Sequence, residues 1–240
     1  HHLYNYASGP SLPLSDMNGL GRFWIGDAWF KLYWSAFAVL LCLAAHVLWR
    51  RGNRLALWPR LRSAGRRMTG PVLAIGALSS VLWLGSGAFI YYNTNVQNRY
   101  RPAPERERMR AERERTLLGF ERVVQPRIRE LSLDVQLHPR QTRVVTHGEY
   151  VLENHTTAPL PAVHVRWHQK TRLDELGLSG ASLERAWPEF QYRIYQLQPP
   201  LAPSERRVLR FATTLEEHGF PNEGALTRVV DNGTFVNNDE

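Results

Sequence analysis

The chain has 240 residues, of which 43% are hydrophobic, which suffices for one or two folded domains. Its formal net charge is +8, but residues 50–70 alone carry seven arginines and no acid, residues 1–49 are neutral, and residues 71–240 carry +1. This distribution argues against a nucleic-acid-binding protein, in which basic residues cover a binding face. The single cysteine, Cys42, excludes an internal disulfide.

Two apolar segments predict membrane-spanning helices. Residues 32–49 contain no formal charge, and residues 71–92 are equally apolar. Each is close to the length of about 20 residues that a helix needs to cross a bilayer, and neither has the polar stripe of a soluble helix. Aromatic residues typical of the membrane interface flank both segments: Phe23, Trp24, Trp29, Tyr33, Trp34, Tyr91 and Tyr92. Residues 1–31 are therefore expected to be extracytoplasmic or interfacial.

The arginine-rich loop at residues 50–70 predicts the orientation of the two spans. Short loops that carry many basic residues stay in the cytoplasm and contact anionic lipid. Basic residues also lie on the opposite side of the spans, so charge favours a cytoplasmic loop only modestly: Arg22, Lys31, Arg99, Arg101, Arg106, Arg108 and Arg110.

The second span is rich in small residues, which allow helices to approach closely. We therefore expect it to pack against other transmembrane helices. The residues are Gly76, Ser79, Ser80, Gly85, Ser86 and Gly87.

Residues 93–123 are expected to form a charged stalk helix. Residues 105–122 contain six arginines and five glutamates, so their net charge is close to zero. The spacing predicts ion pairs between Arg108 and Glu112 and between Arg110 and Glu114. A nucleic-acid-binding element is disfavoured because the segment is nearly neutral and has no interleaved aromatic residues.

Residues 124–240 have the period-two alternation of β-strands. Leucine and valine alternate with polar residues over residues 131–137, and similar patterns recur at 143–152, 163–167, 190–194 and 209–213. We expect a turn at residues 138–141, an irregular insert or short helix at residues 169–189, and a break between the last two strands at Pro199, Pro200 and Pro203. Antiparallel strands joined by turns predict a β-sandwich. The predicted fold class is thus a membrane α-helical hairpin with an all-β extracytoplasmic domain.

No catalytic, cofactor-binding or metal-ligating residue is predicted. His164 and His168 share a face of one expected strand, but four residues separate them by about 13 Å, too far to chelate one zinc ion. The sequence contains no H-E-x-x-H, no glycine-rich phosphate loop and no G-x-S-x-G.

Several segments carry a family resemblance. They are HHLYNYASGPSLPLSDMNG at the start, WRRG after the first span, FIYYNTNVQNRY after the second, VQLHPRQTRVVTHGEYVLENHTTAPLPAVHV, PLAPSERRVLRF, GFPNEG and VVDNGTFVNN. Together they resemble bacterial membrane proteins in which an ABC-type permease region is fused to an aminopeptidase N-like zinc metallopeptidase domain. Ser204 departs from the pattern, since a glycine is expected at that turn.

The resemblance implies that this chain is a fragment, comprising the last two spans and the N-terminal β-domain at residues 124–240. It implies no functional residue here, because the zinc-binding motif would lie beyond Glu240. The expected protein is a non-catalytic, bacterial inner-membrane segment with residues 93–240 periplasmic. Its expected partners are the lipid bilayer, other transmembrane helices of the parent and an ABC ATPase subunit, without nucleic acid.

Two alternatives remain open. In one, the chain belongs to an ABC-type transporter permease whose β-domain binds or gates substrate, with no peptidase activity. In the other, it is a membrane-anchored binding module without an enzymatic partner.

Overall fold

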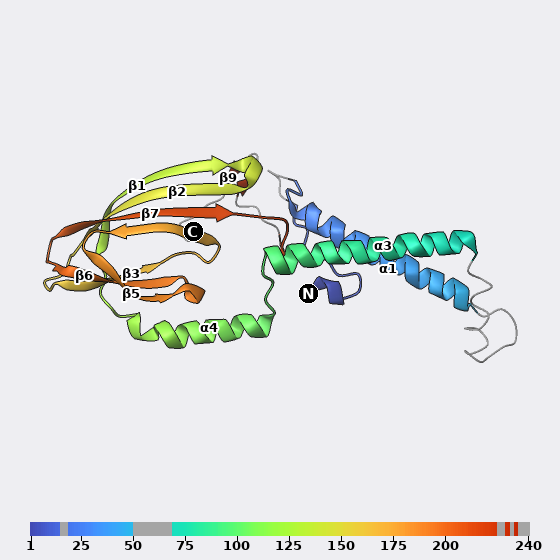
Figure 1. The fold of residues 1–240 in the computed structure, drawn as a ribbon, viewed down its shortest axis with the longest axis horizontal. Coiled ribbons are helices and arrows are strands. Elements are labelled where there is room, and N and C mark those ends of the chain that lie inside the picture. The colour runs from blue at the N-terminus through green and yellow to red at the C-terminus, as the bar shows by residue number, and fades with distance from the viewer. Residues whose placement is uncertain (15–18, 50–68, 225–228, 231–232, 235–240) are drawn as a thin grey trace. The chain divides into compact units, whose positions relative to one another are not determined.

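The computed structural model describes residues 1–14, 19–49, 69–224, 229–230 and 233–234 (Figure 1). They belong to two compact units. Unit 1 contains residues 1–102 and 218–226, and unit 2 contains residues 103–217 and 227–240. The arginine-rich loop lies almost entirely outside the described residues, so its location stays a prediction.

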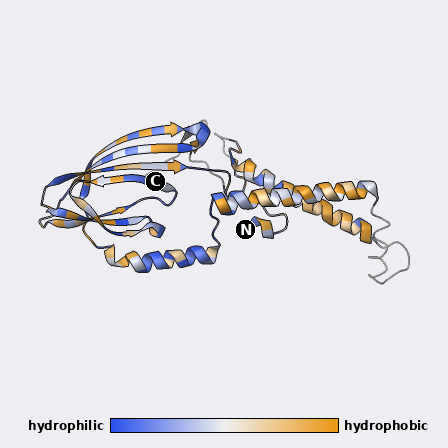
Figure 2. Ribbon diagram, viewed as in Figure 1, coloured by the Kyte–Doolittle hydropathy of each residue, from blue (hydrophilic) through white to orange (hydrophobic). Residues whose placement is uncertain are grey.

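Unit 1 is built on two apolar helices, α1 (Phe23–Leu48) and α3 (Gly70–Tyr91). Both are long and apolar enough to cross a membrane, as their colouring in Figure 2 shows. The helix α1 begins well before the uncharged run at residue 32, so Trp24 and Trp29 belong to its first turns. Pro71 occupies the first turn of α3, where a missing N–H leaves no hydrogen bond unmade.

Some of the small residues of α3 are explained by its contact with α1. A Cβ atom on Gly87 would lie 3.0 Å from the Tyr33 ring, and one on Gly76 would lie 3.6 Å from Leu43. A Cβ atom on Gly85, by contrast, would meet no described residue within 4 Å. Close packing of α1 therefore accounts for Gly76 and Gly87, and Gly85 stays open to another neighbour.

At the end of α3 the chain continues into a π-helical turn, η3 (Tyr92–Gln97), where two polar side chains hydrogen-bond to carbonyls of the preceding turn. The Asn93 side chain donates a hydrogen bond to the Phe89 carbonyl at 2.9 Å, and the Thr94 hydroxyl donates to the Ile90 carbonyl at 2.8 Å. The first residues of the chain, including η1 (His2–Tyr4), lie beside this turn, since His1 Nε2 is 3.0 Å from the Thr94 hydroxyl.

The segment that returns from unit 2 at His218 is held at the same end of the helix pair. The Asn98 amide donates to the backbone carbonyls of His218 at 2.9 Å and Phe220 at 3.2 Å. Phe220 packs into a buried cluster with Phe30 and Ile90. The chain therefore leaves unit 1 and re-enters it at one end of the helices.

Unit 2 begins with α4 (Ala103–Leu117), which confirms a helix within the predicted stalk. No residue of α4 is buried, although Met109, Arg113 and Leu117 are half-buried along one side. The expected i,i+4 ion pairs on this helix do not form among the described residues. The four side chains concerned are exposed to solvent, where an ion pair contributes little.

The rest of unit 2 consists of antiparallel sheets, which confirms the predicted strand pairing in outline. The pairing order is β1-β2-β7-β4 in a four-stranded sheet, β3-β6-β5 in a three-stranded sheet and β8-β9 in a short ribbon. The strands are β1 (Arg127–His138), β2 (Arg143–Glu153), β3 (Leu160–Arg166), β4 (Thr171–Leu178), β5 (Ala181–Trp187), β6 (Tyr192–Leu201), β7 (Arg206–Glu216), β8 (Val229–Val230) and β9 (Gly233–Thr234).

The two larger sheets share one hydrophobic core. Its buried residues come from both sheets: Leu152, Leu160, Val163, Leu178, Tyr195, Leu197, Leu201 and Leu209. Asn154 fixes the loop between β2 and β3, because its amide donates to the carbonyls of Ala158 and Leu201, both at 2.8 Å. The loop N-x-T-x-A-P is therefore ordered by a buried side chain.

The prediction of an irregular insert or short helix at residues 169–189 was wrong, because this segment forms β4 and β5. Each strand contains a register shift, between Leu173 and Glu175 in β4 and between Leu183 and Arg185 in β5. A bulge adds one residue and so breaks the alternation of apolar and polar residues. That break concealed both strands in the sequence.

The prediction that Pro199, Pro200 and Pro203 all separate the last two strands was wrong in part. Pro199 and Pro200 lie inside β6, at a point where β3 pairing skips from Gln196 to Leu201 and no backbone N–H is required. The turn follows at Ala202–Glu205, where Ser204 has φ 62°. This left-handed conformation confirms the position at which a glycine was expected.

Candidate functional site: the inter-sheet cavity

The four-stranded sheet is wider than the three-stranded sheet that shares its core. The edge strand β1 turns a row of apolar side chains to the same face as the inward residues of β2, since Leu131 pairs with Tyr150 and Val135 with Thr146. The row, which we call the β1 row, consists of Leu131, Leu133, Val135 and Leu137, and these are 47–55% exposed. The β1 row therefore lacks the cover that the inward residues of β2 have.

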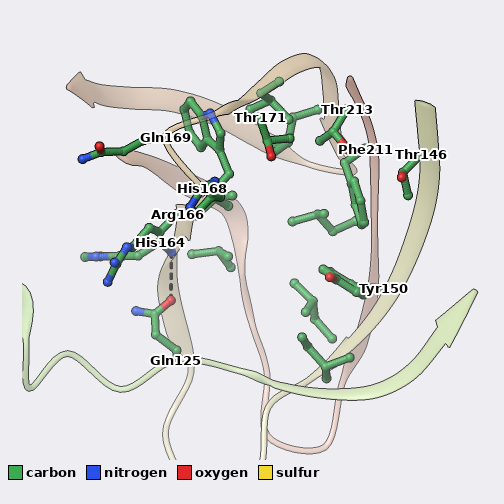
Figure 3. A pocket seen from close by; sticks show the side chains of 18 of the residues that line it. Gln125, Thr146, Tyr150, His164, Arg166, His168, Gln169, Thr171, Phe211 and Thr213 are labelled. Carbon is green, nitrogen blue, oxygen red and sulfur yellow. Dashed lines mark hydrogen bonds between the residues drawn. The ribbon is translucent and has the colours of Figure 1, made fainter. Parts of the chain in front are cut away.

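Between the two sheets lies a cavity of about 800 Å³ (Figure 3). Residues of the larger sheet that line it include Thr146, Tyr150 and Phe211, and Val163 and Val165 of β3 line it opposite. The cavity also reaches Ile128 and Leu133 of β1 and so joins the β1 row. This size lies within the range of about 300–1,000 Å³ that is usual for small-molecule sites, and the mixed lining is also typical.

The cavity extends around the free edge of β3, where its lining becomes polar. His164 and Arg166 lie on the face of β3 opposite to Val163 and Val165, yet all four line the cavity. The backbone N–H of His164 donates to Gln125 Oε1 at 2.8 Å, as Figure 3 shows. Among the described residues, the buried Nε2 of Gln125 has no hydrogen-bond partner, so one donor remains unsatisfied at this edge.

Two guanidinium groups complete this polar part, from Arg113 of α4 and Arg166 of β3. Burial lowers the pKa of Arg113 from its ordinary value, and the like charge of Arg166 lowers it further. Within the described part of the chain, neither arginine forms an ion pair with a carboxylate. The site thus holds two neighbouring positive charges, neither of them in a described ion pair.

His164 itself belongs to an aromatic cluster with Phe120, Trp187 and Tyr192. Its Nδ1 lies 2.6 Å from the Tyr192 hydroxyl, and its ring centroid lies 5.4 Å from that of Phe120. Burial lowers the pKa of His164, an effect that the charge of Glu184 opposes, and burial raises the pKa of Tyr192. These groups hold the start of unit 2 against β3.

The structure also revises the comparison of His164 with His168. The sequence predicted that His168 lies on the same strand as His164. The strand β3 ends at Arg166, however, so His168 lies in the connection to β4. Among the described residues, no three His, Cys, Asp or Glu side chains form a group that could hold a metal ion.

Sequence reasoning missed the residues that give the cavity its charge. Arg113 was interpreted as part of a solvated helix, and Gln125 was not singled out. One available signal is the spacing of Met109, Arg113 and Leu117, which places the arginine on the least polar side of α4. The proximity of Arg113 to Arg166 depends on tertiary structure and has no signal in the local pattern.

Comparisons with known proteins add little to this geometry. No family model matches the chain, and no curated protein matches it. The weak structural neighbours are M1 zinc metallopeptidases. Two structures of a mutant M1 zinc metallopeptidase from Deinococcus radiodurans, one of them bound to a Tyr-Ser-Ala substrate, each show 14% identity and a TM-score of 0.29.

Each of these matches covers 41% of this chain and 24% of the metallopeptidase chain, so this chain spans far less than the whole of that protein. At these values the likeness carries no information about activity. The comparisons give no support for a permease fusion, which stays a prediction.

Proposed function

We propose that the chain is the membrane-anchoring and non-catalytic β-domain part of a bacterial inner-membrane protein that fuses an ABC-type permease to an aminopeptidase N-like domain. In this proposal α1 and α3 cross the membrane, the arginine-rich loop lies in the cytoplasm and unit 2 lies in the periplasm. The β-sandwich formed by its two sheets supports the downstream peptidase module without supplying catalytic groups.

The observation that carries the anchoring proposal is the arrangement at the end of α3. The segments that lead to and from unit 2 are joined through Asn98 at the end of the helix pair where α1 begins and α3 stops. The arginine-rich loop connects the opposite helix ends. If the helices span a bilayer, the loop and unit 2 are on different sides, and the excess of arginine favours the loop as the cytoplasmic part.

The peptidase part of the proposal is supported by the resemblance of the sequence alone. The segment VQLHPRQTRVV forms the end of β1, a turn and the start of β2, and the N-x-T-x-A-P loop is fixed by Asn154. Residues 1–240 should therefore show no zinc-dependent aminopeptidase activity when expressed in membranes, whereas the full parent should show it. Zinc-dependent activity in residues 1–240 would refute the non-catalytic role.

A transporter permease without peptidase activity is the second candidate, and the open surface at Gly85 favours it. Among the described residues, nothing lies within 4 Å of a Cβ atom placed there, which leaves room for a further helix. In the parent protein with Cys42 replaced by Ser, Gly85→Cys should cross-link to cysteines placed in upstream helices. Gly87→Cys, which faces Tyr33, is the matched control, and absence of cross-links from Gly85→Cys would count against this candidate.

A further inference from the structure

We propose that the inter-sheet cavity binds a single-chain anionic lipid of the long-chain fatty acid type. The acyl chain lies between the sheets and along the β1 row, and the carboxylate lies at Arg113 and Arg166. This goes beyond the proposed function, because it requires neither a peptidase nor a permease.

The apolar part of the ligand is indicated by the β1 row. Four neighbouring aliphatic side chains remain about half exposed on an inward face, and the cavity continues this surface beneath the sheet. Exposed apolar area of this kind is unfavourable in water, and a contiguous patch commonly marks a binding site. A flexible hydrocarbon chain can follow such a surface from the β1 row into the cavity without needing hydrogen-bond partners.

The anionic part is indicated by the polar edge of the cavity. Arg113 and Arg166 place two positive charges together without a described carboxylate, and the pKa of Arg113 is lowered partly by this repulsion. The buried Gln125 amide adds an unsatisfied donor beside them. A carboxylate there would neutralise the repulsion and accept charge-assisted hydrogen bonds, which are the strong ones.

A peptide strand fits this site less well. Strand addition needs a row of free backbone groups at a sheet edge. At the edge of β3 the backbone N–H of His164 already donates a hydrogen bond to the Gln125 side chain. The edge strand β1 is interrupted by a register shift between Ile128 and Glu130. Of the edge strands that line the cavity, β3 thus has one backbone N–H occupied and β1 has a register shift near its start. A peptide backbone also offers no negative charge to Arg113 and Arg166, so lipid is the favoured occupant.

Photoaffinity labelling of the full chain in membranes tests this proposal. The probe is a palmitate analogue that carries a diazirine and an alkyne, and labelled peptides are mapped by mass spectrometry. Labelling of α1 and α3 is expected from lipid in the bilayer, so the decisive readout is labelling of residues 127–153. Unlabelled palmitate should compete for that labelling, and methyl palmitate should not.

The double variant Arg113→Gln and Arg166→Gln should weaken labelling of residues 127–153 by about tenfold to a hundredfold, the range for lost hydrogen bonds to a charged group. The matched control is Arg110→Gln with Arg185→Gln, because these arginines are exposed on α4 and β5 and do not line the cavity. Equal urea midpoints for unit 2 in both double variants would show that folding is intact.

Four results would overturn the proposal. The first is labelling confined to α1 and α3. The second is equal labelling of residues 127–153 in the two double variants, and the third is equal competition by the methyl ester. The fourth is a polypeptide that cross-links to β1 or β3 in place of the lipid, which would identify strand addition.

Discussion

Asn98 joins the outgoing chain to Phe220 of the returning chain, because its amide donates to the Phe220 carbonyl at 3.2 Å. The same amide also donates to the carbonyls of Asn93 and His218, both at 2.9 Å. One side chain thus connects the end of α3 with the segment that follows β7. All four residues belong to unit 1, so this contact holds the returning segment within that unit.

Replacing Asn98 should therefore release the returning segment. Asn98→Ala removes the N–H donors and should lower the free energy of unfolding by about 1–3 kcal/mol, because buried carbonyls lose their hydrogen bonds. Asn98→Asp should lower it further, because its carboxylate oxygens would face those carbonyl oxygens without a hydrogen between them. A glutamate-specific protease should cleave after Glu223 faster in both variants, with Asp faster than Ala. Cleavage after the exposed Glu184 in β5 is the internal control and should not change. Equal cleavage after Glu223 in wild type and variants would contradict the anchoring role.

A second prediction concerns the wall of the inter-sheet cavity, where the Phe211 ring lies against the backbone of Gly148. A Cβ atom at position 148 would lie 2.0 Å from Cζ of Phe211, so the ring must move. We expect Gly148→Ala to lower the free energy of unfolding by about 1–3 kcal/mol, as overpacking does. Urea-dependent pulse proteolysis of the full chain measures this change.

Gly177→Ala in β4 is the matched control for that experiment. A Cβ atom at position 177 would meet nothing within 4 Å, so the substitution should be neutral or stabilise by up to about 1 kcal/mol, the usual difference between Gly and Ala within a strand. Adding Phe211→Leu to Gly148→Ala should recover part of the loss, because the smaller side chain vacates the space. No recovery would mean that the ring is not the cause.

The parts of the fold that the sequence predicts are those with uninterrupted local patterns. The two apolar helices, the charged helix α4 and the strands around Leu131–Leu137 each keep one period throughout. The strands β4 and β5 escape prediction because bulges at Leu173–Glu175 and Leu183–Arg185 shift the alternation. The cavity could not be predicted from the sequence for another reason. Arg113 and Arg166 come close together only because α4 packs near β3.

A third prediction follows from the lowered pKa of His164, whose main cause is burial. Because the folded state binds a proton less readily than the unfolded state, acidification favours unfolding. Stability should fall as the pH decreases from the ordinary pKa of histidine, about 6.5, to the lower pKa in the folded protein. His164→Gln should flatten this dependence between pH 7 and the folded-state pKa.

Urea midpoints of unit 2 measured across this pH range check the effect. His155→Gln is the control, because His155 is exposed in the loop after β2. Its profile should match that of the wild-type chain. An unchanged pH dependence in His164→Gln would show that another group is responsible.

The most direct test of the account is the location of unit 2 relative to the arginine-rich loop. Cys42 is the only cysteine, so replacing it by Ser gives a cysteine-free chain in which Ser182→Cys on exposed β5 or Ser63→Cys in the loop reports location. With a membrane-impermeant maleimide applied to cells that have a permeabilised outer membrane, we predict labelling of Ser182→Cys at once and of Ser63→Cys only after lysis. Labelling of Ser63→Cys in intact cells, or of both positions to the same extent, would contradict the proposed topology.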